Sequence, residues 1–407
     1  MSVVRMLLVT AVALGQQLPP PFHSPWFRRP TAVVEMPEGR RLTVPEGFTV
    51  NVFADDLQHA RWMALSPNGD VFLAESRRGE ITVLRDADGN GIAEARSTFA
   101  RGLNRPFGLA FWRGFLYVGN NDAIVRFRYS AGQVEAAGPP ETLAALPPSD
   151  RAVDRDTAER LSIPLNQTRG YNHWTRNLIF HPAGTKLYVT VGSATNATPD
   201  DDPRRAAISE FNPDGTGHRV FAGGLRNPVG LAWYPGTDVL WAAVNERDQL
   251  GDDVPPEFIT SVRDGGFYGW PYSYIGDHVD PTVSPPRPDL VARALAPDVL
   301  LPAHSAPLGL LFYTGSRFPA EYRHSAFVAL HGSINRSRLS GYSVVRIPFR
   351  DGRPAGPAES FLTGFVVRDD EEKQAWGRPV GLLELGDGSL LVSDDGGNRI
   401  WRVAYGP

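Results

Sequence analysis

The chain has 407 residues, of which 42% are hydrophobic and 21% are charged, so it contains enough apolar material for a large buried core. Its formal net charge of −4 argues against the basic surface that nucleic-acid-binding proteins normally present, and no nucleic-acid partner is expected. Because the chain contains no cysteine, disulfides, thiolate zinc sites, cysteine nucleophiles and a covalently attached c-type haem are excluded.

Residues 1–15 have the form of an export signal. Arg5 precedes an apolar run from Met6 to Leu14, and the small residue Gly15 follows that run. The run is too short to span a bilayer comfortably, and no later segment could cross a membrane. The sequence therefore predicts a signal peptide, a periplasmic or secreted protein, and no membrane span. The alternative is a disordered apolar N-terminus.

Residues 16–45 are rich in proline and lack hydrophobic periodicity, so we expect an extended arm. From about Gly47, short runs of β-branched and aromatic residues alternate with Gly, Asp, Asn and Pro, which is typical of strands joined by turns. Residues 46–407 are expected to form one all-β domain without a long amphipathic helix. The longer intervals 130–170 and 270–305 are expected to be loops on one face of that domain.

An internal repeat predicts the architecture. Each unit has a polar or arginine lead-in, a small residue followed by apolar ones, a turn and a second apolar strand. Units of this kind bury one another's faces when they are arranged radially around a channel. We therefore predict a six-bladed β-propeller with four-stranded blades, in which the last strand, 399–405, closes the ring beside the first blade. The six segments begin at Arg61, Arg105, His173, Arg226, Ala306 and Arg378.

The lead-in residues are expected to converge on one mouth of the channel, because they occupy equivalent positions in the repeat. Guanidinium groups that converge there favour a ligand with several carboxylates or phosphates, held by bidentate pairs. The alternative is that these arginines cap strand ends and pair with loop aspartates. The lead-in residues are Arg61, Arg105, His173, Arg226, Asn227 and Arg378.

Two histidines are candidates for acid–base chemistry. His173 enters the channel register among cationic neighbours, which favour the neutral imidazole that a general base requires. His331, in the segment His331-Gly-Ser-Ile-Asn-Arg336, follows the second strand of the fifth unit. Serine hydrolysis is disfavoured, because the sequence has no Gly-x-Ser-x-Gly elbow.

Two acidic segments are candidates for calcium binding. Asp86-Ala-Asp88-Gly-Asn90-Gly91 begins like an EF-hand loop, but Ser97 stands where a bidentate Glu is needed, so a hairpin turn is favoured over a surface calcium. The segment 245–257 holds several carboxylates in a loop, and such hard oxygen ligands indicate calcium. The alternative for this segment is a solvated acidic loop.

Four segments together resemble a known family. Their order and spacing are similar to those of the soluble pyrroloquinoline quinone (PQQ)-dependent sugar dehydrogenases, particularly the sorbosone and aldose sugar dehydrogenase branch. The resemblance extends from about Gly47 to Tyr405 and implies a six-bladed propeller that holds PQQ over the channel mouth and oxidises a small-molecule sugar. Because no haem-binding cysteine pair is present, the electrons are expected to leave to a separate acceptor. The segments are Gly224–Leu231, Asn245–Asp253, Gly265–Pro271 and His331–Arg336.

The resemblance also implies roles for individual residues. His173 looks like the general base that takes the substrate's hydroxyl proton while hydride passes to the quinone. Arg226 and Asn227 match a pair that contacts the quinone oxygens, and Arg378 matches an arginine that binds the cofactor's carboxylates. The residues assigned to the cofactor are Arg226, Asn227, Arg378, Arg105, Arg336 and His331.

By the same resemblance, the backbone carbonyls of Asp248 and Gln249 ligate a calcium ion that also binds PQQ. Asp253, Glu257 and the backbone of Tyr268 fall near a second, structural calcium.

The chain departs from the glucose-oxidising branch next to the histidine, where Asn172 and Ser193 replace acidic residues, so glucose is disfavoured as the substrate and the partner of His173 is open. Two other functions remain open. One is a calcium-dependent lactonase-type propeller hydrolase, which predicts acidic lead-ins, and the other is a non-catalytic binding propeller.

Overall fold

The computed structural model describes residues 18–27, 30–149 and 173–406. The predicted signal peptide lies outside these ranges. Within them the chain is almost entirely β-structure. The helices in the described part are one turn of α-helix, α2 (Pro288–Val291), and one 3-10 turn, η1 (Ala320–Tyr322). None of the described helices is long and apolar enough to cross a membrane.

Six large sheets can be traced through the described residues, and the first three in chain order are as follows. The first contains β3 (Ala60–Leu65), β4 (Val71–Glu75), β5 (Glu80–Arg85) and β6 (Ala95–Ala100). The second contains β7 (Leu109–Trp112), β8 (Phe115–Gly119), β9 (Ala123–Arg128) and β10 (Glu141–Ala145). The third contains β11 (Leu178–Phe180), β12 (Leu187–Val191), β13 (Ala207–Phe211) and β14 (Arg219–Gly223), to which β18 (Gly266–Phe267) adds in parallel.

The other three large sheets follow in chain order. The fourth contains β15 (Asn227–Trp233), β16 (Leu240–Asn245), β17 (Glu257–Ser261) and β21 (Val299–Leu301). The fifth contains β22 (Pro307–Phe312), β23 (Ala326–Leu330), β24 (Ser343–Ile347) and β27 (Glu359–Leu362). The sixth contains β30 (Pro379–Glu384), β31 (Leu390–Asp394), β32 (Arg399–Tyr405) and β2 (Phe48–Ala54).

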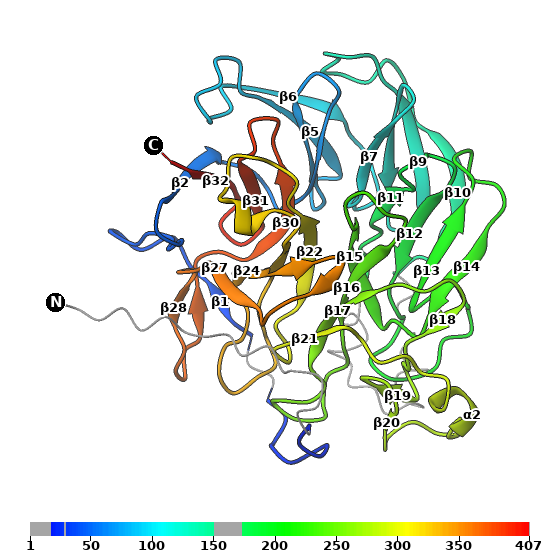
Figure 1. The fold of residues 1–407 in the computed structure, drawn as a ribbon. Helices are drawn as coiled ribbons and strands as arrows, with labels where there is room; N and C mark the ends of the chain where they lie inside the picture. Colours follow the sequence, from blue (N-terminus) through cyan, green and yellow to red (C-terminus); the bar gives the residue numbers. More distant parts are fainter. Residues whose placement is uncertain (1–17, 28–29, 150–172, 407) are drawn as a thin grey trace.

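The first strands of these sheets form a closed ring. Strands β3, β7, β11, β15, β22 and β30 contact one another in chain order, and β30 contacts β3. Figure 1 shows the sheets following one another around the molecule in the order of the sequence colours. Each predicted repeat unit supplies the first two strands of one sheet, and the prediction of an all-β fold with four-stranded antiparallel sheets is confirmed.

The glycine found at the small-residue position in several of the repeat units reflects crowding of the inner strands. A Cβ atom on Gly381 would lie 2.6 Å from the backbone oxygen of Arg61 in the neighbouring sheet. A Cβ atom on Gly230 would lie 2.8 Å from the backbone oxygen of Leu308. Inner strands can therefore approach one another this closely only where the side chain is absent.

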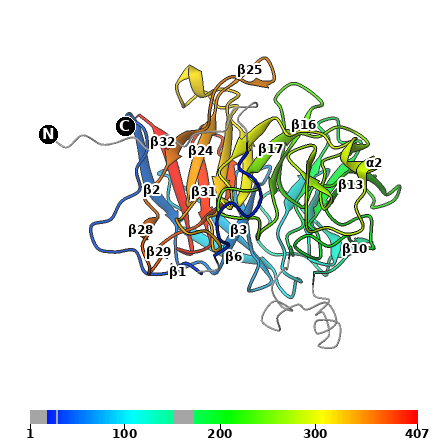
Figure 2. The ribbon, with the colours of Figure 1, turned by 90° about the horizontal axis from the view of Figure 1, so that it is seen from below.

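Closure of the ring joins the two ends of the domain in one sheet. Strand β32 is the third strand of the sixth sheet and is hydrogen-bonded within that sheet, and its Ile400 packs in one core cluster with Met63 and Leu73 of the first sheet, as predicted. The outer edge of the sixth sheet is β2, which pairs antiparallel with β32 from Phe48 opposite Tyr405 to Ala54 opposite Ile400. Figures 1 and 2 both show β2 and β32 side by side. The two ends of the domain are thus joined by a hydrogen-bonded ladder in one sheet.

The intervals predicted as loops contain short elements. Interval 270–305 contains the hairpin β19 (Ser273–Tyr274) and β20 (His278–Val279), helix α2, and β21. Interval 130–170 contains β10, and residues 150–172 lie outside the described ranges. A further hairpin, β25 (Phe349–Arg350) and β26 (Arg353–Pro354), lies in the connection between β24 and β27 of the fifth sheet.

The predicted arm lies against the domain. Strand β1 (Ala32–Val33) pairs in parallel with β29 (Gln374–Ala375), which in turn pairs with β28 (Val366–Arg368). Earlier in the arm, the Ser24 hydroxyl oxygen accepts a hydrogen bond of 2.8 Å from the backbone N–H of Asp252.

Aromatic and aliphatic side chains fill the spaces between the sheets. Between the first and second sheets, Phe72 packs edge-on against Phe99 and Phe111. Between the fifth and sixth sheets, Phe48 packs edge-on against Phe318 and Phe361. This packing holds the sheets as rigid supports, so the residues at the ends of the inner strands have fixed positions.

Candidate active site

A cavity of about 380 Å³ lies where the lead-in residues converge. Three arginines and three histidines line it, and Asp395 is the one acidic residue among its described lining residues. A second cavity of about 320 Å³ shares six of its lining residues with the first. The polar residues that line the first cavity include His59, Arg61, Arg77, His173, Asn227, Asn245, His331, Arg378, Asp395 and Asn398.

Asp395 connects three cationic or ionisable groups in the first cavity. Its carboxylate accepts a hydrogen bond of 2.5 Å from Arg61 and one of 2.8 Å from Nε2 of His331, and Nε2 of His59 lies 3.3 Å away. Burial raises the pKa of Asp395, but the hydrogen bond from His331 and the charge of Arg61 outweigh it and hold that pKa well below the usual range. Burial and the charge of Arg378 lower the pKa of His331 to about 4, so its ring is neutral. Asp395 therefore remains an ionised acceptor, and the Nδ1 lone pair of His331 remains available.

The positive charge of this cavity exceeds what Asp395 neutralises. Arg378 donates hydrogen bonds to two backbone oxygens, that of His331 at 3.1 Å and that of Gly332 at 2.7 Å, and Arg77 is a third guanidinium in the lining. Backbone carbonyls carry no formal charge, so the guanidinium groups leave a net positive lobe. Such a lobe fits a ligand with several carboxylates.

His173 has a defined tautomer. Its Nδ1 atom lies 2.9 Å from the backbone oxygen of Ser193 and 3.1 Å from the Ser193 hydroxyl, which itself donates to Thr195 at 2.6 Å. Because both serine oxygens act as acceptors, Nδ1 carries the proton and Nε2 carries the lone pair. Burial, followed by the charge of Arg226, holds the pKa of His173 well below its usual value, so the ring is neutral. Ser193 is therefore the partner that the sequence left open.

The second cavity is lined by carboxylates. Burial raises the pKa of Glu246 to about 7 and that of Glu257 to about 8. Glu257 accepts a hydrogen bond of 2.5 Å from the backbone N–H of Glu246. The Oε1 atom of Glu246 is buried and has no hydrogen-bond partner among the described residues. A buried carboxylate oxygen that lacks a donor, as Oε1 of Glu246 does, is available to a divalent cation that takes hard oxygen ligands.

Asp248 lines the same cavity as these glutamates, and its carboxylate has more polar contacts than theirs. Asn335 donates a hydrogen bond to its carboxylate, and Nδ1 of His304 lies 3.4 Å from the same oxygen. Burial opposes ionisation, but the hydrogen bond to His304 and the charge of Arg226 hold the pKa of Asp248 well below its usual range. The backbone oxygen of Asp248 accepts a hydrogen bond of 3.0 Å from Asn196.

Several sequence-predicted residues lie outside both cavities. Asp253 is exposed and forms an ion pair with Arg336, and neither residue is among those lining the cavities. Arg105 is also exposed and lies outside both linings. Asp253 is therefore separated from Glu257, which lines the second cavity.

The other two predicted calcium residues have their own contacts. Gln249 lies next to Asp248, and its side-chain oxygen is 3.4 Å from Asn196. Tyr268 is buried, and its hydroxyl donates a hydrogen bond of 2.6 Å to Ser261.

Other cavity residues were not anticipated from the sequence. The second strands of the sheets also end at this mouth, so Asn245, His331 and Asp395 occupy comparable places at the ends of β16, β23 and β31. His331 and the segment that begins at Asn245 had been recognised from the sequence, and counting forward along the second strands would also have found Asp395. The residues missed are His59, Arg77, Glu246, His304, Asn335 and Asp395.

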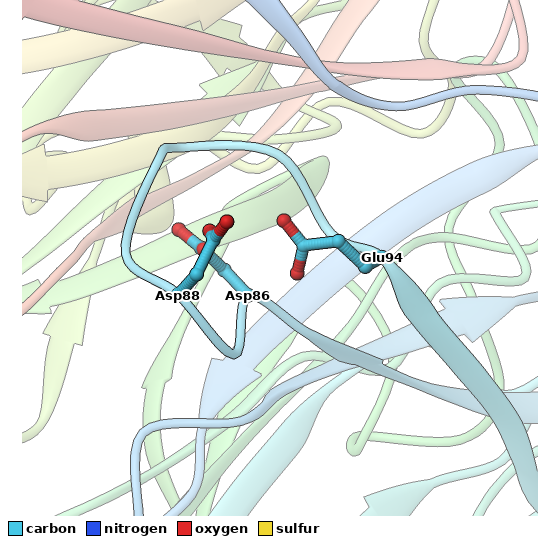
Figure 3. A group of neighbouring side chains, drawn as sticks. All are labelled: Asp86, Asp88 and Glu94. Atoms are coloured by element: carbon cyan, nitrogen blue, oxygen red, sulfur yellow. The ribbon is translucent and has the colours of Figure 1, made fainter.

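A separate acidic group lies on the surface in the turn between β5 and β6, as the hairpin interpretation predicted. Figure 3 shows the carboxylates of Asp86, Asp88 and Glu94 facing one another, and their ligand atoms lie within 4.8 Å. Asp86 accepts hydrogen bonds of 2.8 Å from the backbone of Gly89 and Gly91. These contacts stabilise the turn, and none of the three acidic residues lines either cavity.

Comparison with known proteins places the chain in a family. The family model described as TrAA12-like matches residues 42–256 and 290–405. A PQQ-dependent pyranose dehydrogenase from Coprinopsis cinerea is 27% identical over 57% of this chain and 40% of its own length. A protein of uncharacterised function from Borreliella burgdorferi is 29% identical over 89% of this chain and 91% of its own length.

Solved structures share the fold. The holo PQQ domain of the Coprinopsis cinerea pyranose dehydrogenase superposes with a TM-score of 0.73 at 22% identity, covering 93% of this chain and 100% of that domain. The PQQ-bound aldose sugar dehydrogenase from Streptomyces coelicolor superposes with a TM-score of 0.60 at 18% identity, covering 89% of this chain and 99% of that one. The chain therefore belongs to the TrAA12-like family, and its resemblance to the soluble PQQ-dependent sugar dehydrogenases is confirmed.

Proposed function

We propose that this chain is a six-bladed β-propeller that uses PQQ to oxidise a sugar or a related alcohol or aldehyde of the aldose or sorbosone type. One observation carries the proposal: a positively charged cavity holds a neutral histidine of fixed tautomer, His173, in a member of this family. The arginine lining disfavours a lactonase-type hydrolase, which requires acidic lead-ins.

The chain's own residues have distinct tasks in this reaction. Arg378 and Arg61 attract and orient a polycarboxylate in the first cavity, and Asn227 presents a buried side-chain oxygen with no partner among the described residues. PQQ, when bound, supplies the two-electron acceptor for the substrate's hydride. Nε2 of His173 takes the proton of the substrate hydroxyl, so that the oxidised carbon becomes a carbonyl. Of the other residues assigned to the cofactor, Arg226 and His331 line the cavities, whereas Arg105 and Arg336 do not.

We propose a calcium site in the second cavity. Its support is that Glu246, Asp248 and Glu257 line this cavity and that Oε1 of Glu246 has no hydrogen-bond partner among the described residues. The family resemblance adds the backbone oxygens of Asp248 and Gln249 as ligands. Three carboxylates that line one buried cavity favour a divalent cation that neutralises them. Asp253 and the backbone of Tyr268 stand apart, so an ion held there would be a second one.

The cellular context forms part of the same proposal. A signal peptide at residues 1–15 exports the protein to the periplasm or the cell exterior, the arm is residues 16–45, and the catalytic domain is residues 46–407. The family match begins at residue 42, close to the proposed start of that domain. The electrons pass to a separate acceptor.

Reconstitution tests the proposed function directly. The purified protein is expected to bind PQQ in the presence of calcium and to reduce an artificial dye when an aldose or a related alcohol is added. Cofactor binding is measured by absorbance and turnover by dye bleaching across a panel of sugars. A protein that fails to bind PQQ but hydrolyses lactones would contradict the dehydrogenase assignment.

The calcium site predicts a pH-dependent stability. The pKa values of Glu246 and Glu257 are raised to about 7 and about 8, so the stability that these two groups contribute to the metal-free fold is complete below about pH 4.5 and is lost as the pH rises through those values. Calcium binds the ionised forms, so the difference in Tm between calcium and a chelator should grow between about pH 5 and pH 8. Differential scanning calorimetry measures this difference.

Two variants test which calcium site produces the calcium-dependent rise in Tm, the second cavity or the surface turn. Glu257→Gln is expected to abolish most of the calcium-dependent rise in Tm, and Asp88→Asn, in the surface turn, is expected to leave it unchanged. A rise that is lost in Asp88→Asn and kept in Glu257→Gln would move the calcium site to the surface turn.

A further inference from the structure

His173 is not carried by a strand. Residues 173–177 are irregular and lead into β11 at Leu178. The ring of His173 is held by Ser193, but a single hydrogen-bonded ring does not fix the backbone that carries it. Something else must therefore determine where this backbone lies.

Arg176 supplies that constraint. Its side chain is fully buried, and one terminal nitrogen donates hydrogen bonds to the backbone oxygens of His173 at 2.6 Å and Thr175 at 2.8 Å. The other terminal nitrogen donates a hydrogen bond of 2.7 Å to the backbone oxygen of Pro147, just beyond β10 of the second sheet. One planar guanidinium thus closes the turn that carries His173 and ties it to a neighbouring sheet, a fixed two-pronged geometry that an ammonium cannot reproduce.

Gly192 is a second constraint on His173. It follows β12 and precedes the ring's partner Ser193. A Cβ atom on Gly192 would overlap Cβ of His173 and the side-chain oxygen of Asn227, and it would lie 2.9 Å from Cγ of His173. His173 and Asn227 can therefore lie side by side only because residue 192 has no side chain.

We propose that Arg176 and Gly192 are positioning residues that hold His173 at the distance and angle required for proton transfer, without contacting substrate or cofactor themselves. The inference rests on the proposed function for the role of His173 and adds the residues that place it. Its physical basis is that a displacement of about 1 Å in a reacting group can lower a rate by about 10²-fold.

Three variants test the contributions of Arg176 and Gly192 separately. Arg176→Lys keeps the positive charge but cannot donate to both His173 and Pro147, Arg176→Met removes the donors, and Gly192→Ala inserts a methyl group beside the ring. We expect kcat to fall in all three variants, by about 10-fold in Arg176→Lys and about 10²-fold in the other two. The KM for the sugar and the PQQ dissociation constant should change by less than about 3-fold, because the cavity arginines are untouched.

Two matched substitutions serve as controls. Arg346→Lys alters another buried arginine, which donates to Ser325 and Glu359 in the fifth sheet. Gly223→Ala adds a methyl group to a glycine of β14 that has open space around its missing Cβ atom. Both controls should retain wild-type kcat, so a loss confined to Arg176 and Gly192 variants cannot come from a general loss of packing.

A second readout needs neither PQQ nor turnover. Nitrogen and carbon NMR of histidine-labelled, cofactor-free protein reports the tautomer of His173, with His173→Gln used to assign its signals. The wild type should show a single Nδ1–H form, and Gly192→Ala and Arg176→Met should show a mixture of tautomers. Circular dichroism and the melting curve establish that each variant is folded.

Unchanged kcat together with an unchanged His173 tautomer in folded Arg176→Met and Gly192→Ala proteins would overturn the inference. A uniform loss in the two control variants would also overturn it. If the wild type binds no PQQ and oxidises no sugar, the proposed function fails, and the NMR spectra of the cofactor-free variants still decide whether these residues position His173.

Discussion

The substitution His173→Ala is expected to lower turnover by about 10²–10⁴-fold while PQQ remains bound. The loss follows from the removal of Nε2, the one ring atom that can take the hydroxyl proton when Nδ1 is committed to Ser193. Cofactor affinity should persist because the guanidinium groups of Arg61 and Arg378 remain in the cavity lining. PQQ occupancy is measured by absorbance and the rate by dye reduction under saturating sugar.

His181→Ala provides the matched control. His181 lies beyond β11 next to Asp238 and lines neither cavity, so its removal should leave turnover at the wild-type level. A His173→Ala protein with full PQQ occupancy and unchanged turnover would show that another group accepts the proton.

The second large effect is expected at Arg378. Arg378→Ala should weaken PQQ binding by about 10- to 100-fold, because a charge-assisted hydrogen bond in a buried site contributes about 1.5–3 kcal/mol. Once PQQ is saturating, kcat should change much less, because the substitution leaves His173 and Ser193 in place. Fluorescence or calorimetric titration of the cofactor-free protein with PQQ measures the affinity.

Arg105→Ala tests whether the effect of Arg378→Ala on PQQ binding depends on the position of Arg378 in the cavity. The repeat places Arg105 and Arg378 at equivalent positions, but Arg105 is exposed and lies outside both cavities. Its removal should weaken PQQ binding by far less than the removal of Arg378, and the exposed Arg101, paired with Glu80, supplies a control for charge alone. Equal losses at Arg105 and Arg378 would contradict the cavity as the PQQ site.

The difference between Arg105 and Arg378 shows which structural features the sequence repeat can predict and which it cannot. A repeat fixes the register of a residue along a strand, and that register placed Arg61, Arg226, Asn227 and Arg378 in the cavity linings. It does not encode the local backbone. Arg105 has a left-handed φ of 47°, a conformation that its position in the repeat gives no reason to expect.

The acidic loop shows a similar limit. The segment 245–257 was recognised as a calcium candidate from its carboxylates, and Glu257 and Asp248 do face the second cavity. Which carboxylates gather there depends on burial, which the sequence does not show. Glu246 is buried and lacks a partner for Oε1 among the described residues, whereas Asp253, only a few residues away, is exposed and paired with Arg336.

Composition, strand periodicity and the repeat were sufficient for the all-β sheets and for the residue types at the channel mouth, because these features depend on neighbouring residues and on one unit stacking on the next. Pairings between distant segments could be seen only in the folded chain. Arg61 and Asp395 are 334 positions apart, and β2 pairs with β32 from the other end of the domain. No local pattern specifies such partners. They meet because the ring closes, and closure brings the first and last sheets together around one cavity.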